Sequence, residues 1–164
     1  MKSALGIVHQ RLIFTLTEEE NMAAQFSPYV KRLVEAYNSR TLEEFDSLLS
    51  DDVVLARAGE KARGRDEFKR VLQRLRRAFP DIQYRIDDVI ESGDRIALRW
   101  EANGTHRDEY LGIPATGRNA RYSGVTIYEL RDGKIARVWV AADLFSLLRS
   151  LTESRAASPP DARV

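Results

Sequence analysis

The sequence predicts a single α+β domain in which helices come first and a long antiparallel sheet follows them. Between residues 28 and 79, apolar side chains recur every three or four positions, which is the spacing of amphipathic helices. After Pro80 they alternate with polar side chains, which is the period of half-buried strands. We expect a strongly curved sheet wrapped around the first helix, with an internal pocket at its open end because the sheet is too wide for the helices to fill.

Three helices are expected in the first half of the chain. Ser27 is a suitable N-cap for the first of them and is followed by a proline, which is favoured at the first helical position. Thr41 and Glu44 have the spacing of a capping box at the start of the second helix. Gly64 precedes the third helix, and Pro80 ends it.

The strands are expected from the alternation of apolar and polar residues. A short strand, 53–55, lies among the helices, and 82–90 changes parity partway, which indicates a bulge. A turn rich in small residues leads to the next strand, 95–103, which is followed by a strand at 120–130. The last strand, 135–142, is apolar on both faces, as is typical of a central strand that is covered on both sides.

The chain divides into three parts. Residues 1–21 do not share the apolar pattern of the residues after them and are interpreted as an N-terminal extension. Residues 22–151 form the predicted domain, which ends in a short closing helix at 144–151. Residues 152–164 have little to bury and are expected to form a disordered tail.

The composition excludes several classes of function. A net charge of +1 gives no overall attraction to nucleic acid or to an anionic membrane, so we expect neither as a partner. The chain has no cysteine, and its two histidines, His9 and His106, do not have the spacing of a metal-binding motif. No apolar run approaches the ~20 residues that span a bilayer. We therefore expect a cytoplasmic protein that holds no metal.

Two side chains are candidates for acid–base chemistry. Asp143 ends an apolar strand and shares a face with Trp139, so burial would raise the pKa of its carboxyl group toward the range useful for proton transfer. The alternative role for Asp143 is the N-cap of the closing helix. His106 has the parity of Trp100 and would point into the pocket, where it could donate a hydrogen bond; the alternative is a half-buried histidine that bonds a neighbouring carbonyl.

Aromatic residues are the candidates for binding a ligand in the pocket. They could line its wall and stack on a planar ligand, although an aromatic residue on a strand also serves as ordinary core. The candidates are Tyr37, Trp100, Tyr122, Tyr128 and Trp139. The loop at 111–118 contains two glycines and a proline, and it could either close over the pocket or simply connect two strands.

Several segments together resemble the SnoaL-like polyketide cyclases, which belong to the nuclear transport factor 2-like superfamily of cone-shaped α+β folds. They are GTHRDEYLGIPATGR at 104–118, DGKI at 132–135, Trp139 and Asp143. AYNSRTLEEFDSLLSDDVV at 36–54 extends the likeness, which spans roughly 28–151.

The resemblance implies a cofactor-free intramolecular aldol condensation that closes a ring in an aromatic polyketide ester. It also implies that Asp143 is the general acid/base and that His106 lies in the pocket. The sequence departs from the family pattern where Asp108 replaces a common glycine and Ala115 a common proline. It also has Arg57 and its two alanine neighbours where the family commonly has a pocket-facing histidine, which affects the substrate more than the fold.

The resulting hypothesis is a cofactor-independent acid–base enzyme acting on a small, mostly apolar carbonyl compound held in an internal pocket. One alternative is a non-catalytic ligand-binding or dimerisation module on the same fold. Another is an isomerase or hydrolase of the ketosteroid isomerase or epoxide hydrolase type, because a buried acid can equally move protons in an enone or activate water. A homodimer is expected, since the outer face of an open sheet normally needs cover.

Overall fold

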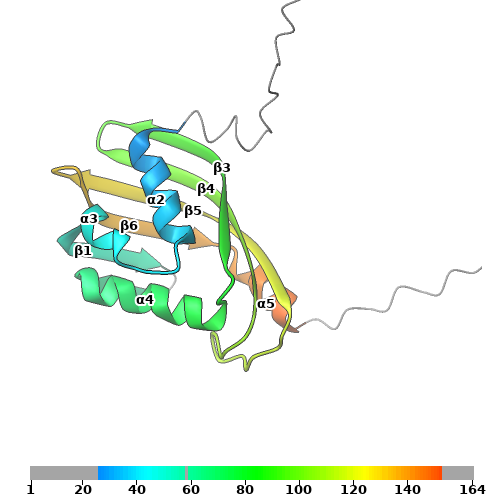
Figure 1. Ribbon diagram of the computed structural model, residues 1–164. Coiled ribbons are helices and arrows are strands. Elements are labelled where there is room, and N and C mark those ends of the chain that lie inside the picture. The colour runs from blue at the N-terminus through cyan, green and yellow to red at the C-terminus, as the bar shows by residue number, and fades with distance from the viewer. Residues whose placement is uncertain (1–25, 58, 153–164) are drawn as a thin grey trace, which may run out of the picture.

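The computed structural model describes residues 26–57 and 59–152 (Figure 1). The expected N-terminal extension, and the expected tail from residue 153 onward, lie outside the described residues. The described part of the chain contains four helices and six strands. In chain order they are α2 (Pro28–Asn38), α3 (Glu44–Leu48), β1 (Leu49–Arg57), β2 (Glu60–Arg63), α4 (Arg65–Ala78), β3 (Gln83–Ser92), β4 (Arg95–Thr105), β5 (Asn119–Arg131), β6 (Lys134–Ala142) and α5 (Leu144–Thr152).

The six strands form one curved, unclosed sheet in the order β2-β1-β6-β5-β4-β3. Strands β3 to β6 are consecutive antiparallel neighbours, which confirms the predicted meander. Strand β1 pairs with β6 in parallel and with β2 in antiparallel. Neither β2 nor the parallel pairing was expected. Helices α2 and α4 lie on the concave side of the sheet, and α5 packs at the end of β5 (Figure 1). The α+β architecture expected from the sequence is confirmed.

The helix starts were predicted with mixed success. Ser27 caps α2 as expected, because its hydroxyl accepts the backbone N–H three residues later at 3.3 Å. The expected capping box between Thr41 and Glu44 is wrong, since α3 begins at Glu44 after Glu43, which makes no side-chain cap bond. The carbonyl of Thr41 instead accepts a hydrogen bond from Arg76 of α4 at 2.7 Å. Thr41 therefore ties the segment between α2 and α3 to α4 and does not cap α3.

A bulge in β6 decides which of its side chains face the helices. Leu130 of β5 pairs with Ile135, but Glu129 pairs with Arg137, so Ala136 is an extra residue without a partner on β5. Ile135 and Ala136 are consequently both buried. A one-residue insertion of this kind moves every later side chain of the strand to the opposite face.

Beyond the bulge, the even-numbered residues of β6 point toward the helices and the odd-numbered ones point away. Val138 is buried, and Val140 and Ala142 line an internal cavity. Trp139 and Ala141 lie on the outer face, where Trp139 is 37% exposed. The expectation that both faces of this strand are covered is therefore wrong for the single chain.

Gly124 of β5 allows Trp100 to pack tightly against the sheet. A Cβ at position 124 would lie 2.5 Å from Trp100 Cζ2 and 2.7 Å from the carbonyl oxygen of Ala141. The indole cannot easily move aside, because its Nε1 donates a buried hydrogen bond of 2.9 Å to Thr126 Oγ1. The absence of a side chain on Gly124 is therefore required by the position of Trp100.

Replacing Gly124 with alanine should destabilise the fold, since either the indole or the β6 backbone has to shift. We expect a loss of about 1–3 kcal/mol in the free energy of unfolding, the usual range for overpacking a core. Urea denaturation followed by circular dichroism measures it. Ser123→Ala, an exposed neighbour on the same strand, is the matched control and should change stability little. Equal stability of the two variants would contradict the close packing at Gly124.

Candidate functional site

A cavity of about 70 Å³ lies between the concave face of the sheet and helices α2 and α4. Its wall is mainly aliphatic and aromatic. Arg57 is the one charged residue among the described residues that line it, and none of these carries a carboxylate. The aromatic residues of the wall are Tyr37, Tyr84, Trp100, Tyr110, Tyr122 and Tyr128, together with Phe68. The site is therefore a small aromatic chamber with a single cation.

The tyrosine hydroxyls of the wall lie near one another. Tyr128 donates to the hydroxyl of Tyr37 at 3.2 Å. The hydroxyls of Tyr84 and Tyr122 are near enough to influence each other's pKa. The ring of Trp100 lies between the latter two, with ring centres 5.5 Å from Tyr84 and 5.6 Å from Tyr122 in edge-to-face contacts. The bond between Tyr128 and Tyr37 uses one hydroxyl proton and leaves the other free to donate to a ligand in the chamber.

Burial fixes the protonation state of these tyrosines. It raises the pKa of Tyr37 to about 12 and raises those of Tyr84, Tyr122 and Tyr128 as well. The hydroxyls therefore keep their protons near neutral pH. They can donate hydrogen bonds to a ligand oxygen, but they cannot act as bases in that range.

Arg57, at the end of β1, brings the positive charge to the cavity. Its side chain is 19% exposed, its guanidinium donates to Tyr110 Oη at 2.8 Å, and its Nε lies 3.7 Å from Glu60. Burial alone would lower the pKa of Arg57, but the contacts with Tyr110 and Glu60 raise it overall, so the side chain stays charged. Sequence reasoning did not single out Arg57 as a site residue, although it has the same strand parity as Leu55, which also lines the cavity.

Tyr110 closes the cavity from the loop between β4 and β5. A single isolated bridge joins Tyr110 to Ile113, and the turn between them contains Leu111 and Gly112, both with positive φ. The ring of Tyr110 packs edge-on against Phe79 at 5.4 Å. Sequence reasoning missed this residue because a loop has no periodicity from which a facing direction can be read.

His106 is fully buried but does not line the cavity. Its ring stacks on Phe79 at 5.2 Å, and its Nδ1 accepts the backbone N–H of Thr116 at 3.3 Å. Since a backbone N–H can only donate, the proton of the neutral ring lies on Nε2, which has no hydrogen-bond partner among the described residues. The prediction that His106 points into the pocket is wrong.

The backbone of His106 joins the two ends of the loop. Its N–H donates to the carbonyl of Arg118 at 2.8 Å, and its carbonyl accepts from Gly117 at 2.9 Å. Together with the bond between the ring and Thr116, these contacts fix the base of the 107–117 segment. The geometry thus gives His106 a positioning role in the loop.

Asp143 is exposed and caps α5. Its carboxylate accepts hydrogen bonds from Ser146 Oγ at 2.6 Å and from the Ser146 backbone N–H at 3.0 Å. These two bonds lower the pKa of Asp143. The expectation of a buried carboxyl with a raised pKa is therefore wrong. The bulge at Ala136 is the reason, because it turns position 143 to the outer face.

Trp139 lies outside the cavity for the same reason. It is on the outer face of the sheet, where the guanidinium carbon of Arg95 lies 6.0 Å from its ring centre. The other aromatic candidates all lie on the cavity wall: Tyr37, Trp100, Tyr122 and Tyr128. Their contact with a ligand stays a prediction.

The described residues contain no group of three or more His, Cys, Asp or Glu side chains placed to hold a metal ion. Within residues 26–57 and 59–152, no helix is both long enough and apolar enough to cross a bilayer.

Comparisons with known proteins agree on one family. A sequence model of the SnoaL-like polyketide cyclases matches residues 28–151. The aklanonic acid methyl ester cyclase DauD of Streptomyces sp. (strain C5) is 30% identical over 113 residues, which are 65% of this chain and 68% of that protein.

Two solved structures have the same fold. IdmH of Streptomyces antibioticus, a candidate polyketide cyclase, is 32% identical with a TM-score of 0.66, and the match covers 75% of this chain and 95% of that one. AclR of Streptomyces galilaeus, a candidate hydroxylase, is 25% identical with a TM-score of 0.68, covering 75% and 92%. From the family match over 28–151, this chain belongs to the SnoaL-like polyketide cyclase family.

Proposed function

We propose that this protein closes a ring in a small carbonyl compound by aldol-type addition, without a cofactor. The observation that carries the proposal is the Arg57–Tyr110 hydrogen bond of 2.8 Å at the wall of an aromatic cavity in a member of this family. Arg57 is the charged group of the wall that can hold an oxygen on which negative charge develops, at the place that Tyr110 Oη takes in this structure. The cytoplasmic location expected from the sequence is part of the same proposal.

The chemistry requires one proton removal and one carbon–carbon bond. A carbon next to a carbonyl loses a proton, the resulting enolate attacks a second carbonyl of the same molecule, and the new alkoxide takes up a proton. The step neither oxidises nor reduces the substrate, so no redox cofactor is needed. Hydrogen-bond donors fixed in a site of low dielectric stabilise the enolate and alkoxide more than water would.

The group that accepts the proton differs from the one that the family resemblance implies, which is Asp143. The four wall tyrosines with raised pKa values keep their protons, and the carboxylate of Asp143 is engaged in capping α5. A carbon that lies between two carbonyl groups is acidic enough to lose its proton to water once the enolate is stabilised. We therefore favour a 1,3-dicarbonyl substrate, whose enolate oxygen is held by Arg57.

A non-catalytic ligand-binding module is the second candidate. The exposed carboxylate of Asp143 favours it, as does the lack of Asp or Glu among the described cavity residues. The same lack of paired carboxylates disfavours a hydrolase, which would need them to activate water.

The direct test is incubation with aklanonic acid methyl ester, the compound in the name of the relative DauD. Aldol addition conserves mass, so liquid chromatography with mass spectrometry should show a product isomeric with the substrate, formed without added cofactor.

Arg57→Met should lower kcat by about 10²–10³-fold, the usual cost of removing one such donor. Arg70→Met, on the exposed face of α4, is the control and should be unchanged. Binding without an isomeric product would favour the binding module, and full activity of Arg57→Met would refute the role of Arg57.

The role of Asp143 can be separated from its structural contribution. Asparagine caps a helix about as well as aspartate, so Asp143→Asn should keep both stability and activity, whereas Asp143→Ala should lower the thermal unfolding midpoint. The low pKa of Asp143 means that its stabilisation is present above the pKa of the unfolded chain and is lost as pH falls through the folded-state pKa. Asparagine does not titrate, so at low pH the stability of the wild type should fall below that of Asp143→Asn. A drop in activity of ~10²-fold or more in Asp143→Asn, with unchanged stability, would instead establish the acid–base role implied by the resemblance.

We also propose that the protein forms a homodimer through the outer face of the sheet. Ile127 is paired across the sheet with Trp139, and Val125 with Ala141, which gives one continuous exposed apolar patch. Ion pairs border it, among them the bond of 3.1 Å between Arg95 and Glu129. A patch with charges of both signs at its rim can pair with a second copy of itself.

Light scattering after gel filtration should give twice the chain mass of 18.7 kDa. Ile127→Lys places a charge inside the patch and should yield a monomer, because two lysines would be buried together. Ile90→Lys alters an equally apolar residue that is 63% exposed on β3, and it should leave the dimer intact. A monomeric wild type at micromolar concentration would contradict the dimer.

A further inference from the structure

The cavity is too small for the ligands that its chemistry suits. At about 70 Å³ it exceeds the ~30 Å³ share of one water molecule in the liquid but falls short of the ~150 Å³ cavity that holds benzene. Any ring compound must therefore displace part of the wall. This inference rests on the proposed site and identifies the part that moves.

Two surface depressions share residues with the cavity wall. The first, of about 340 Å³, shares Arg57, Val71 and Tyr110 with it and is called the vestibule here. The second, of about 710 Å³, runs along the edge strand β3 and is called the β3 groove. It shares Val34, Tyr84 and Ile86 with the cavity. A ligand passing through either depression would have to move the residues shared with the cavity.

The wall toward the β3 groove is held firmly. The backbone N–H of Tyr84 donates to Asn38 Oδ1 at 2.7 Å, and its carbonyl accepts from Asn38 Nδ2 at 2.9 Å. The ring of Tyr84 is in contact with those of Tyr37 and Trp100. Moving Tyr84 would break contacts with α2 and with β4 at once.

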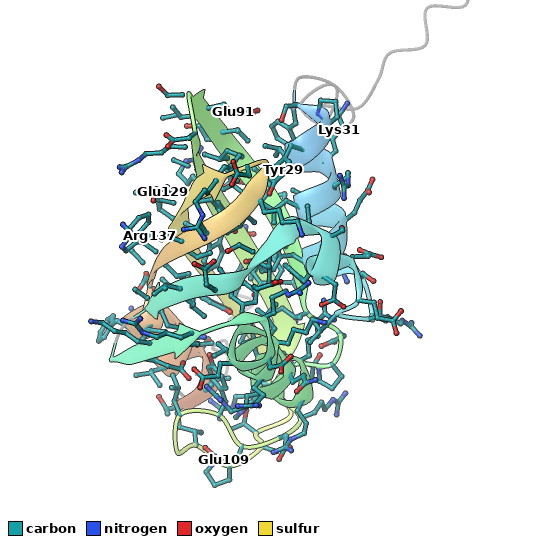
Figure 2. The ribbon with its side chains drawn as sticks, turned by 90° about the vertical axis from the view of Figure 1, so that its left-hand side faces the viewer. Tyr29, Lys31, Glu91, Glu109, Glu129 and Arg137 are labelled. Carbon is teal, nitrogen blue, oxygen red and sulfur yellow. The ribbon has the colours of Figure 1, made fainter. Side chains whose placement is uncertain are left out.

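The wall toward the vestibule is held less firmly, by one hydroxyl bond and by the contact of the buried Tyr110 ring with Phe79. The Tyr110 hydroxyl makes one described hydrogen bond, to Arg57, and its backbone pairs only with Ile113 across the tip of a loop. The base of that loop is fixed by His106, and Asp108 is paired with Arg77 of α4 at 3.0 Å, so the part that can turn without disturbing the sheet is the tip at 109–113. Figure 2 labels Glu109, next to Tyr110, on this loop at the end of the molecule away from Tyr29 and Lys31 of α2.

Three arginines and two glutamates line the vestibule: Arg57, Arg74, Arg77, Glu60 and Glu109. Arg74 is ion-paired with Glu60, and Arg77 with Asp108 at 3.0 Å, so an anionic ligand has to compete with these carboxylates for the two arginines. The β3 groove also has one more arginine than glutamate among its described lining residues, so charge does not decide between the two routes. The choice between the two routes therefore depends on how firmly each wall is held. The charge of the vestibule then determines which ligands it attracts.

We infer that ligands reach the cavity from the vestibule by displacing Tyr110 from Arg57, and that this route selects planar ring compounds carrying an anionic group. The rings take the place vacated by the Tyr110 side chain and the adjoining cavity. The anionic group stays in the vestibule beside Arg74 and Arg77. The ligand is thus a planar ring compound with its charged end toward solvent.

The route is tested with a matched pair of variants. Tyr110→Phe and Tyr84→Phe each remove one hydroxyl and keep the ring, but on opposite walls. Stopped-flow quenching of tryptophan fluorescence by anthraquinone-2-carboxylate gives the association rate, since Trp100 lines the cavity. Tyr110→Phe should associate about tenfold faster than wild type, the scale expected on losing a hydrogen bond to a charged donor. Tyr84→Phe should associate at the wild-type rate. Acceleration in Tyr84→Phe alone would overturn the route.

The charge selection is tested with anthraquinone-2-carboxylate and its methyl ester, which share one ring system. At low salt the acid should associate about tenfold faster than the ester, and the difference should shrink as sodium chloride is added. The double variant Arg74→Met/Arg77→Met should bring the acid close to the ester rate. Arg85→Met/Arg121→Met, which removes the same charge from the β3 groove, should not. Equal rates for acid and ester in the wild type would overturn the selection.

These measurements separate the inference from the proposed function, because they detect binding without turnover. If the probes behave as expected but aklanonic acid methyl ester yields no isomer, the route stands and the cyclase proposal fails. If the isomer forms while Tyr110→Phe and added salt leave association unchanged, the cyclase proposal stands and the route fails.

Discussion

The extra residue in β6 is the constraint on which the site depends. With Ala136 unpaired, Val140 and Ala142 face the helices, while Trp139 and Asp143 face away. A regular strand would have placed the carboxylate on the cavity side. The bulge therefore removes the acid from the chamber and leaves Arg57 as its charged group among the described residues. The chemistry open to this protein is decided by that change of face.

The fold was predictable from the sequence because it depends on patterns that survive tertiary packing. The alternation after Pro80 identified the meander and even the bulge between Ile86 and Asp88, where the change in parity is visible in the sequence. The β6 bulge was not visible, since Ile135 and Ala136 are both apolar and either could face the core. One undetected residue was enough to misplace Asp143.

The site residues on regular strands could be predicted from the alternation of side chains, but those at strand ends and in loops could not. Tyr122 and Tyr128 lie on a regular strand, so their parity indicated the cavity side correctly. Arg57 could have been found in this way, but a charged side chain at a strand end suggests solvent more than a cavity. Tyr110 could not have been found, because only the folded loop brings it to Arg57, 53 residues away in the chain.

His106 explains how one loop can be both anchored and movable. Its Nε2–H has no hydrogen-bond partner among the described residues, and such a buried donor costs about 1–3 kcal/mol. The stacking on Phe79 and the bond from Thr116 to Nδ1 offset that cost and hold the loop ends together. Phe79 also contacts Tyr110 with its edge, so the anchor and the tip share one aromatic neighbour. A histidine that holds the base of the loop leaves the tip to the Phe79 contact and to the Tyr110 bond with Arg57, and a ligand oxygen can replace that bond.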